Sequence, residues 1–433
     1  MHRFRAKIAV RYLHAMAALC LSALLVHAPF SVAADMADSA PIRVGILHSK
    51  TGTMAVSEQP VADATLLAIE QINAQGGLLG RRLEAVMADG KSDENTFALE
   101  AARLIGEEHV DVLFGCWTSA SRKAVKPLVE EMDSLLFYPV QYEGLEQSDH
   151  IVYTGAVPNQ QIVPAVNWAI NHLGKRVYLI GSDYVFPHVA NWLIRKQLHI
   201  MQADLVGESY VLLGASDFSS VIADIRRLHP DVIMNTINGD SNTAFFHALK
   251  RAGVTADRTP VLSFSLAEAG MQRIPVDEIA GQYAAWSYFQ SLGGSANRAF
   301  VTAFHRRFGS VAISDPMESA WVGVQLWASA VKSAGTSDPR VIRDTILHQS
   351  LDAPEGTVAV DQNSHHLWKV ARIGRVNRQR QFDVVWSSGR ALKPFPYPLF
   401  VKRDEARALL NRLYSGWGGQ WSAPAPATGG GHE

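Results

Sequence analysis

Short apolar runs alternate with amphipathic stretches over most of the chain. The runs at 42–47, 82–89, 110–115 and 135–140 are mostly apolar, which is typical of strands that are buried on both faces of a parallel sheet. The stretches between them carry apolar residues three and four positions apart, which predicts helices with one buried face. This alternation predicts parallel strands joined by right-handed crossovers.

The same pattern begins again after residue 175. Five further strands are predicted at 176–183, 205–213, 231–239, 260–265 and 281–289. Three helical stretches follow without matching strands, so they must pack on the first unit and the chain must cross back. The segments "GTVAVD", "LWKVARIG" and "QFDVVWS" then predict a small antiparallel set.

These patterns predict two lobes and two terminal segments. The expected boundaries are 35–157 plus 289–352 for an N-terminal lobe, 158–288 plus 353–415 for a C-terminal lobe, and 416–433 for a disordered tail rich in Pro, Ala and Gly.

The first 34 residues differ from the rest. "MHRFRAKIAVRYLH" is basic, "AMAALCLSALLVHA" is apolar but short for a bilayer, and "SVAAD" offers small residues to a signal peptidase. We interpret 1–34 as a cleavable secretory signal rather than a buried helix or a retained anchor. Lipid modification at Cys20 is disfavoured, because "AALC" lacks the usual small residue before the cysteine.

Composition narrows the function. Of 433 residues, 48% are hydrophobic and 19% charged, and the formal net charge of -1 gives no reason to expect nucleic acid or an acidic membrane as partner. Beyond the signal, Cys116 is the single cysteine, so no internal disulfide can form and core burial must hold the fold.

Ligands of parallel sheets bind in loops at the carboxyl ends of the strands. Here these loops read "HSKTGTMAVSE", "GCWTSAS", "YPVQYEG", "GSDYVFP" and "NGDSN". All are rich in small polar residues, with an aromatic residue or a carboxylate nearby. They predict a small polar ligand held between two lobes.

The motifs of common enzymes are missing from the sequence. It has no dinucleotide-binding glycine motif that opens a helix, no phosphate-binding lysine loop and no G-x-S-x-G elbow. The adjacent His365 and His366 lack nearby ligands at metal-binding spacing. Cys116 has no histidine beside it, since His109 precedes the strand, so we expect a packed thiol and neither catalysis, metal nor cofactor.

The loop motifs carry a resemblance. "GILHSKTGTMAVSE", "GCWTSASRKAVKP", "LLFYPVQYEGLEQS", "YTGAVPNQQIVPAVNW", "GSDYVFP", "NGDSNTAFF", "SDPMESAW" and "DAPEGTVAVDQNSHHLWKVARIG" occur in order between 41 and 398. Together they resemble the urea-binding and amide-binding branch of the type I periplasmic binding proteins, which serve ATP-driven (ABC) importers.

The resemblance implies an α/β fold of two doubly wound parallel-sheet lobes joined by a three-crossing hinge. It also implies a monomer in the periplasm that closes on its ligand and delivers it to the permease subunits in the inner membrane. Aliphatic-amide sensors are similar but cytoplasmic, so the predicted signal favours the transport protein. Trp117, and Val140 with Gln141 before Tyr142, resemble the urea transporter version.

Urea is planar and neutral, with four N–H donors and one carbonyl acceptor, so a specific site needs several acceptors, a donor and flat apolar faces. The loops supply such groups, and the residues expected to bind the ligand are Glu58, Trp117, Thr118, Ser119, Gln141, Tyr142, Tyr184 and Asp240.

Several of these residues have a structural alternative. Trp117 can fill the core, Glu58 can favour a helix N-terminus, and Asp240 or Ser119 can cap a helix. Arg122 and Lys123 are expected on a solvated helix face or as a latch between lobes.

Two other functions stay open. One is an exported amidohydrolase, for which no nucleophile and base or metal cluster is found. The other is a binding protein for short-chain aliphatic amides or branched-chain amino acids. In the latter case backbone N–H groups of the helix after Ser119 can hold the ligand carboxylate.

Overall fold

A parallel sheet of five strands organises the N-terminal lobe of the computed structural model, which describes residues 40–424. The strand order is β2-β1-β3-β4-β5, and every neighbouring pair is parallel, as predicted. The strands are β1 (Ile42–His48), β2 (Leu83–Asp89), β3 (Val112–Gly115), β4 (Leu136–Tyr138) and β5 (Ile151–Tyr153). The sequence pattern missed β5, which has three residues. The predicted secretory signal lies outside the described residues.

Both faces of this sheet are buried, which explains the continuous apolar runs. In β3, Val112 and Phe114 enter one core while Leu113 enters the core on the opposite face. Because alternate side chains point to opposite faces of a strand, a sheet covered on both faces needs apolar residues at successive positions.

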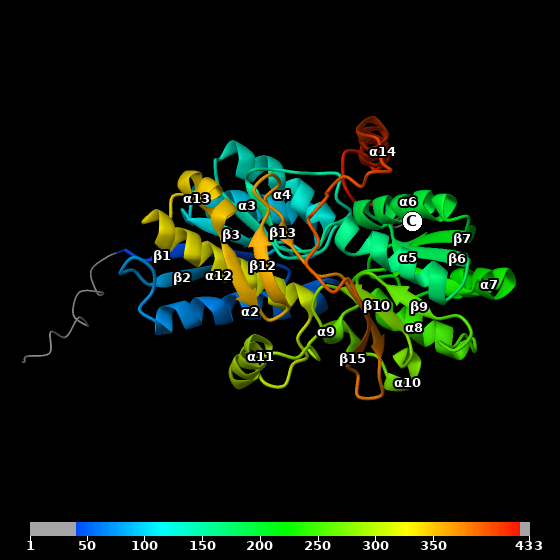
Figure 1. Cartoon of the computed structure of the whole chain (residues 1–433). Helices are drawn as coiled ribbons and strands as arrows, with labels where there is room; N and C mark the ends of the chain where they lie inside the picture. Colours follow the sequence, from blue (N-terminus) through cyan, green and yellow to red (C-terminus); the bar gives the residue numbers. More distant parts are fainter. Residues whose placement is uncertain (1–39, 425–433) are drawn as a thin grey trace, which may run out of the picture. The chain divides into compact units, whose positions relative to one another are not determined.

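Helices from two distant parts of the sequence cover the sheet. α12 packs against α2 and against the strands, and Figure 1 shows these yellow and blue helices side by side. The expected return of the chain to the N-terminal lobe is therefore observed. The helices are α2 (Ala55–Ala74), α3 (Glu94–Gly106), α4 (Ser119–Glu131), α11 (Ser295–Phe308), α12 (Asp315–Ala334), α13 (Pro339–Thr345) and the 3-10 turn η2 (Ile346–His348).

A seven-stranded sheet organises the C-terminal lobe, in the order β15-β14-β10-β9-β8-β6-β7. The first five strands along the chain pair in parallel, and β14 with β15 adds an antiparallel hairpin at one edge. The strands are β6 (Arg176–Ser182), β7 (Asp204–Val211), β8 (Val232–Thr236), β9 (Val261–Ser263), β10 (Tyr283–Trp286), β14 (Arg372–Val376) and β15 (Phe382–Ser387).

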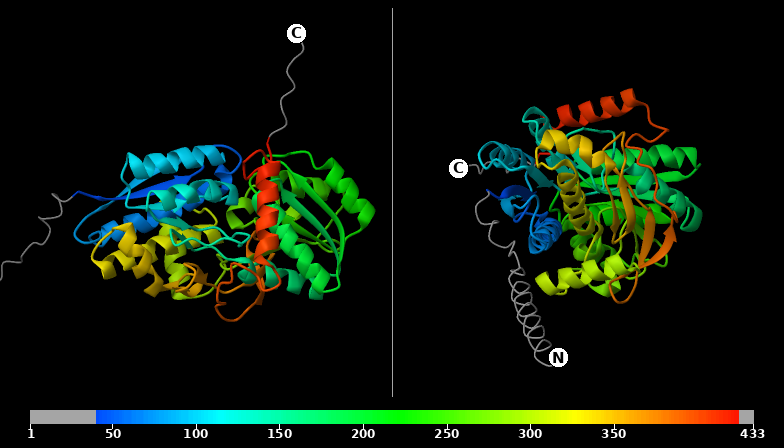
Figure 2. Two further views of the ribbon diagram at one scale, coloured as in Figure 1. Left: turned by 90° about the horizontal axis from the view of Figure 1, so that it is seen from above. Right: turned by 60° about the vertical axis from the view of Figure 1, so that its left-hand side comes forward.

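Most helices of this lobe lie in the connections between the strands of this sheet. They are η1 (Pro158–Gln160), α5 (Ile162–His172), α6 (Val185–Ile200), α7 (Ser219–Leu228), α8 (Ser241–Arg251), α9 (Glu268–Met271), α10 (Val276–Ile279) and α14 (Arg403–Gly416). α14 packs on α6, and the views of Figure 2 show this red helix beside the green strands and helices of the lobe.

The predicted antiparallel set divides into two separate pieces. β12 (Gly356–Val360) and β13 (Leu367–Trp368) join β11 (Ser350–Ala353) in a third sheet, and their side chains pack in the core that contains Trp327 of α12. The expected lobe boundary at 353 therefore differs from the structure, which keeps the chain in the N-terminal lobe up to β13. The run "LWKVARIG" is interrupted because Lys369 turns into the interior, where its ammonium pairs with Glu355 at 2.7 Å.

The prediction of disorder from residue 416 is wrong for residues 417–424. Trp417 and Trp421 pack against the core that contains α6 and α14, and the backbone of the segment bonds to the loop before α6. Composition favoured disorder here, but the two indoles supply apolar area that can be buried. The remaining tail residues lie outside the described range.

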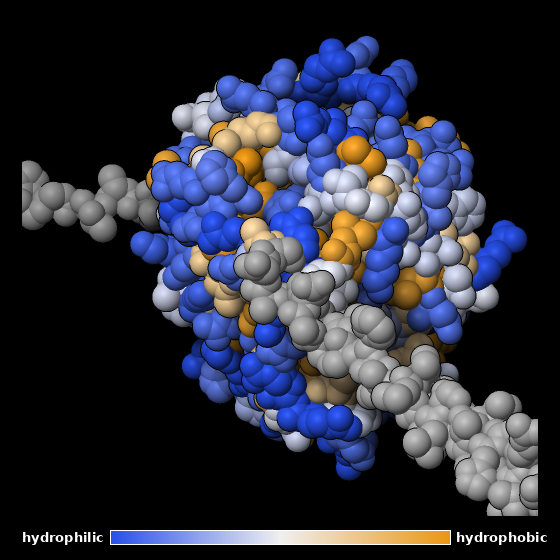
Figure 3. All heavy atoms as spheres, turned by 90° about the vertical axis from the view of Figure 1, so that its left-hand side faces the viewer, coloured by the Kyte–Doolittle hydropathy of each residue, from blue (hydrophilic) through white to orange (hydrophobic). Residues whose placement is uncertain are grey.

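Residues 40–424 contain no helix that is both long enough and apolar enough to cross a membrane. The face shown in Figure 3, at the N-terminal-lobe end, is mainly hydrophilic, and its apolar residues form small separate groups.

Candidate functional site

The loop after β3 places an indole at the carboxyl edge of the first sheet. Gly115 passes so close to β1 that a Cβ there would lie 2.3 Å from the Leu47 carbonyl oxygen, and Cys116 follows in the left-handed region with φ 67°. Thr118 then caps α4, because its hydroxyl accepts from the Ser121 N–H at 3.0 Å. Thr118 is therefore the N-cap residue, and the structural alternative in which Ser119 caps this helix does not hold.

Trp117 links the two lobes. Its Nε1–H donates to Asn238 Oδ1, which follows β8, at 3.1 Å, and both side chains are buried. The Asn238 amide group in turn donates to the Thr236 carbonyl at 3.2 Å and to Ser265 Oγ at 3.1 Å. Sequence reasoning selected the "NGDSN" loop but missed its first residue as a contact of Trp117.

Gln141 forms a second link between the lobes. Its Nε2 donates to the Phe264 carbonyl, after β9, at 2.7 Å. Gln161 Nε2 donates to the same carbonyl at 3.1 Å and to the Ala285 carbonyl at 2.7 Å. The Oε1 atoms of both glutamines are buried and have no hydrogen-bond partner.

Asp240 lies at the rim instead of inside the site. Its side chain is exposed, and its carboxylate accepts from the hydroxyl of Thr53 in the opposite lobe. It makes no side-chain cap to α8 either. Gly239 has φ 69° and would place a Cβ 2.9 Å from the Thr53 carbonyl oxygen, so a side chain here would hold the lobes apart. The structure thus makes Asp240 a contact between lobes.

Glu58 presents a carboxylate oxygen to the interior. The side chain is fully buried in the first turn of α2, and Oε2 accepts from the Ser49 N–H at 2.8 Å and lies 3.2 Å from His48 Nδ1. Oε1 is buried without a partner. A buried acceptor in this state carries an uncompensated desolvation cost, which a donor can relieve.

Tyr184 lies in the C-terminal lobe, directly before α6, and is buried. Burial raises the pKa of its phenol well above the usual range, and the carboxylates of Glu143 and Glu58 raise that pKa further while Arg122 opposes them. The Tyr184 phenol therefore stays protonated throughout the ordinary pH range.

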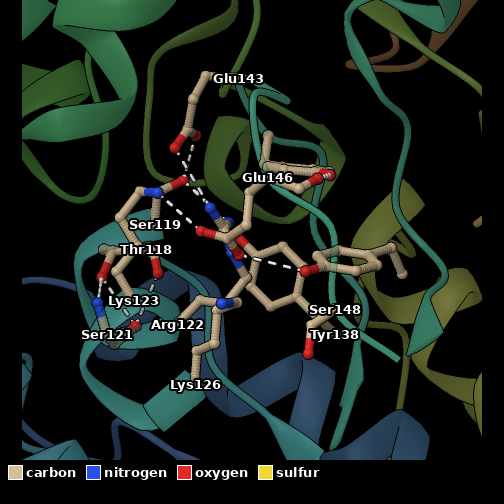
Figure 4. A network of polar contacts seen from close by, with 12 residues as sticks. Thr118, Ser119, Ser121, Arg122, Lys123, Lys126, Tyr138, Glu143, Glu146 and Ser148 are labelled. Carbon is tan, nitrogen blue, oxygen red and sulfur yellow. Dashed lines mark hydrogen bonds and ion pairs between the residues drawn. The ribbon is translucent and has the colours of Figure 1, made fainter. Parts of the chain in front are cut away.

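Arg122 and Lys123 form a buried ionic cluster with Glu143 and Glu146 (Figure 4). Arg122 pairs with Glu143 at 3.2 Å and with Glu146 at 2.9 Å, and Lys123 pairs with Glu146 at 2.7 Å. The cations hold the pKa of Glu146 well below its usual range, although burial alone would raise it. The expectation of a solvated face is wrong, because both cations are neutralised inside the protein.

Ser119 belongs to this cluster. Its hydroxyl donates to Glu143 Oε2 at 2.5 Å and accepts from Arg122 Nη1 at 3.0 Å. Its hydrogen-bonding capacity toward a ligand is therefore largely used, and the predicted contact of Ser119 is better described as support for the site.

Tyr142 is buried in a cluster of aromatic and charged side chains. Its ring stacks on Tyr153 at 5.1 Å between centroids and on His366 at 5.8 Å, and Arg122 lies 4.4 Å from its centroid. Its hydroxyl lies 2.6 Å from His366 Nε2 and donates to the Glu146 carbonyl at 3.0 Å. These contacts engage Tyr142 with groups of its own lobe, and its contact with a ligand stays a prediction.

Cys116 is a packed thiol in the structure. It is fully buried, and burial raises its pKa above the ordinary range, with Glu58 adding to the effect. The thiolate that a nucleophile requires is therefore disfavoured.

A narrow cavity beside Trp117 opens between the lobes. Ser57 and Trp117 of the N-terminal lobe face Gly239, Asn242 and Ser265 of the C-terminal lobe across it. The site thus consists of carboxyl-end loops from both sheets, brought together in a closed arrangement.

The arrangement of two such sheets around an interlobe site matches a known family. The model for the periplasmic binding protein domain matches residues 42–403. The chain belongs to this family. The fold predicted from the sequence motifs, that of the type I periplasmic binding proteins, is confirmed by the solved structures.

Periplasmic binding proteins of solved structure are similar along most of the chain. A solute-binding protein of an ABC transporter from Rhodopseudomonas palustris, in complex with 3,4-dihydroxybenzoic acid, has a TM-score of 0.75 at 19% identity and covers 82% of this chain and 98% of its own. The branched-chain amino acid transporter protein LivJ of Streptococcus pneumoniae, in complex with isoleucine, has a TM-score of 0.71 at 19% identity and covers 82% and 100%.

Similar sequences include Leu/Ile/Val-binding protein homolog 7 of Brucella melitensis, 22% identical over 84% of this chain and 95% of the relative. Limonene hydroxylase of Geobacillus stearothermophilus is 35% identical over 118 residues, which are 27% of this chain. The match spans only 22% of that relative's own length.

Proposed function

We propose that this chain is the exported solute-binding component of an ABC importer, and that it captures urea by closure of its two lobes. Several of the similar solved structures are substrate-binding or solute-binding proteins of ABC transporters, which supports the transport role. The choice of urea rests on the chemistry of the loops between the lobes.

The observation that carries the proposal is a set of unpartnered acceptors. Glu58 Oε1, Gln141 Oε1 and Gln161 Oε1 are all buried without a hydrogen-bond partner. Urea brings four N–H donors in one plane, so it suits a site with acceptors in excess. Trp117 and Tyr184, in two of the carboxyl-end loops, supply buried aromatic side chains.

The charge balance of the site also favours a neutral ligand. The two cations that lie nearest in the sequence motif, Arg122 and Lys123, are committed to Glu143 and Glu146. An amino-acid carboxylate would have to compete with these pairs or depend on backbone N–H groups at the start of α4. Urea requires neither.

Closure explains how a protein without a chemical step can serve transport. The hydrogen bonds of Trp117 to Asn238 and of Gln141 to Phe264 exist only when the lobes approach. A ligand that contacts both lobes stabilises the same state, and so shifts the population toward it. The permease subunits of the inner membrane would then recognise the closed form.

A branched-chain amino acid is the second candidate, because curated relatives carry Leu/Ile/Val-binding names. A short-chain aliphatic amide is a close variant of the urea proposal, since it keeps the carbonyl and one amide group.

Isothermal calorimetry on the purified protein separates these ligands when urea, acetamide, formamide and leucine are titrated in turn. We expect saturable binding of urea that Glu58→Gln weakens at least tenfold, because an amide places donors where the buried acceptor is needed. Glu70→Gln is the matched control, since Glu70 lies on the same helix but is exposed and paired with Arg307. Leucine binding without urea binding would refute the assignment of urea as the ligand. Release of ammonia would refute a purely binding role.

A further inference from the structure

The segment after α14 forms a short bridge with the loop between β6 and α6, which contains Tyr184. The Val185 N–H donates to the Trp421 carbonyl at 2.9 Å, and the Ala423 N–H donates to the Asp183 carbonyl at 3.0 Å. These bonds make an antiparallel bridge between Tyr184 and Ser422. The segment is therefore attached directly around Tyr184.

The same segment is bound to the N-terminal lobe by Glu94, in the first turn of α3. Glu94 Oε1 accepts from the Trp421 N–H at 2.8 Å, and Oε2 accepts from Ser422 Oγ at 3.0 Å. In addition, Lys123 Nζ lies 4.9 Å from the centroid of the Trp421 ring. Two consecutive residues thus contact both lobes at once.

Side-chain packing fixes the segment in place. The Trp421 ring packs on Tyr414 of α14 at 4.6 Å, and the Trp417 ring meets His188 of α6 at 5.2 Å. Burial raises the pKa of Glu94, although its hydrogen bonds to Trp421 and Ser422 lower it, and the carboxylate is half-buried at this contact. Figure 2 shows α14, which leads into the segment, lying between the blue and the green halves.

We infer that residues 417–424 act as a clasp between the lobes, and that Glu94 positions the Tyr184 loop in the closed state through this clasp. Opening of the hinge must break the bonds of Glu94 or pull the segment away from the loop. The clasp thus slows the release of a bound ligand. This inference rests on the proposed capture of a solute by closure.

Two substitutions of Glu94, a control on α3 and a shortened chain test the role of Glu94. Glu94→Ala removes both acceptors, whereas Glu94→Gln keeps an acceptor for the Trp421 N–H and offers a donor to Ser422 Oγ. Glu100→Ala is the matched control on α3, where Glu100 pairs with Arg103 of the same helix. A chain that ends after Gly416 removes the clasp altogether and serves as the second variant if Glu94→Ala fails to fold.

Stopped-flow fluorescence with urea gives the first measurement. We expect Glu94→Ala and the shortened chain to raise the dissociation rate about tenfold, the effect of losing a hydrogen bond to a charged group, with little change in the association rate. Glu94→Gln should stay within about threefold of the unmodified protein. If Glu94 had a purely structural role, Glu94→Ala would change the melting temperature without raising the dissociation rate selectively over the association rate.

A second measurement needs no ligand. Leu99 of α3 is 72% exposed and Ile200 of α6 is 61% exposed, so cysteines at these positions can carry spin labels while the buried Cys116 stays unlabelled. We expect Glu94→Ala and the shortened chain to shift the distance distribution between the labels to longer values. Glu94→Gln and Glu100→Ala should leave it unchanged.

The two measurements keep the proposals apart. If urea does not bind but the label distances change as expected, the choice of ligand fails and the clasp stands. If the distances and the dissociation rate are the same in Glu94→Ala as in Glu100→Ala, the clasp is refuted whichever solute binds.

Discussion

The hydrogen bond between Trp117 and Asn238 gives a direct test of closure. The donor and acceptor are 3.1 Å apart, and the side chains are 4% and 1% exposed. When the lobes separate, water can take over both groups, so the net contribution of the bond is about 0.5–1.5 kcal/mol. A loss of about 1 kcal/mol lowers the population of the closed form about fivefold, and ligand affinity falls by the same factor.

A double-mutant cycle isolates this bond from the change in packing. Trp117→Phe keeps an aromatic ring but removes the N–H, and Asn238→Ala removes the acceptor. We expect a coupling of about 1 kcal/mol in the dissociation constant for urea measured by calorimetry. The control cycle pairs Trp117→Phe with Lys332→Ala, an exposed position on α12, and should give no coupling.

A coupling below about 0.3 kcal/mol between Trp117 and Asn238 would refute the role of this bond in closure. Trp117→Ala is a less specific change than Trp117→Phe. Because the indole packs in the core of the N-terminal lobe, its loss should also cost about 3–5 kcal/mol of folding free energy.

Three further predictions concern buried ionisable groups. Burial raises the pKa of Glu268 to about 8, so its carboxyl stays protonated in the folded protein at neutral pH, whereas the unfolded chain ionises above about pH 4.5. The folded protein therefore loses stability as the pH rises from about 4.5 toward 8. Glu268→Gln should raise the free energy of unfolding by up to about 3 kcal/mol at pH 7 and by little at pH 4, as measured by thermal unfolding. Burial lowers the pKa of His366 to about 3, so its ring stays neutral in the folded protein while the unfolded chain takes up a proton. The free energy of unfolding therefore falls by about 2 kcal/mol as the pH decreases from 7 to 5, and His366→Gln should lack this part of the pH dependence in the same assay. Arg122→Met leaves Glu143 and Glu146 without their shared cation and should destabilise the fold by about 3–5 kcal/mol in chemical denaturation, whereas a loss below about 1 kcal/mol would contradict the buried network.

The alternation of apolar runs and amphipathic helices determined much of the fold. It predicted the parallel sheets and the return of α12 to the first lobe, because a sheet covered on both faces leaves a strong local signal. The pattern failed at β5 and at the interrupted strand around Lys369. Three residues carry too little periodicity, and the buried ion pair with Glu355 is a contact between distant segments.

The sequence also predicted which loops form the candidate site, since carboxyl ends of parallel strands converge at one edge. It could not assign the side chains within them. Tyr142 and Trp117 occur in equally polar loops, yet the Tyr142 ring packs against Tyr153 and His366 while the Trp117 indole reaches Asn238 in the opposite lobe. Only the tertiary structure decides this, because the partners lie far away along the chain.

The same reason explains the ionic cluster and the clasp. Arg122 and Lys123 read as a solvated helix face, and residues 417–424 as part of a disordered tail, because local composition reports average exposure and not the partner of a given group. Glu146 and Glu94 reverse both interpretations by supplying charge and acceptors at short range. The sequence by itself determined the two-lobed α/β architecture and the edge at which the site lies. The tertiary structure decided which charges are neutralised and which segments join the lobes, since those depend on distances that no local pattern encodes.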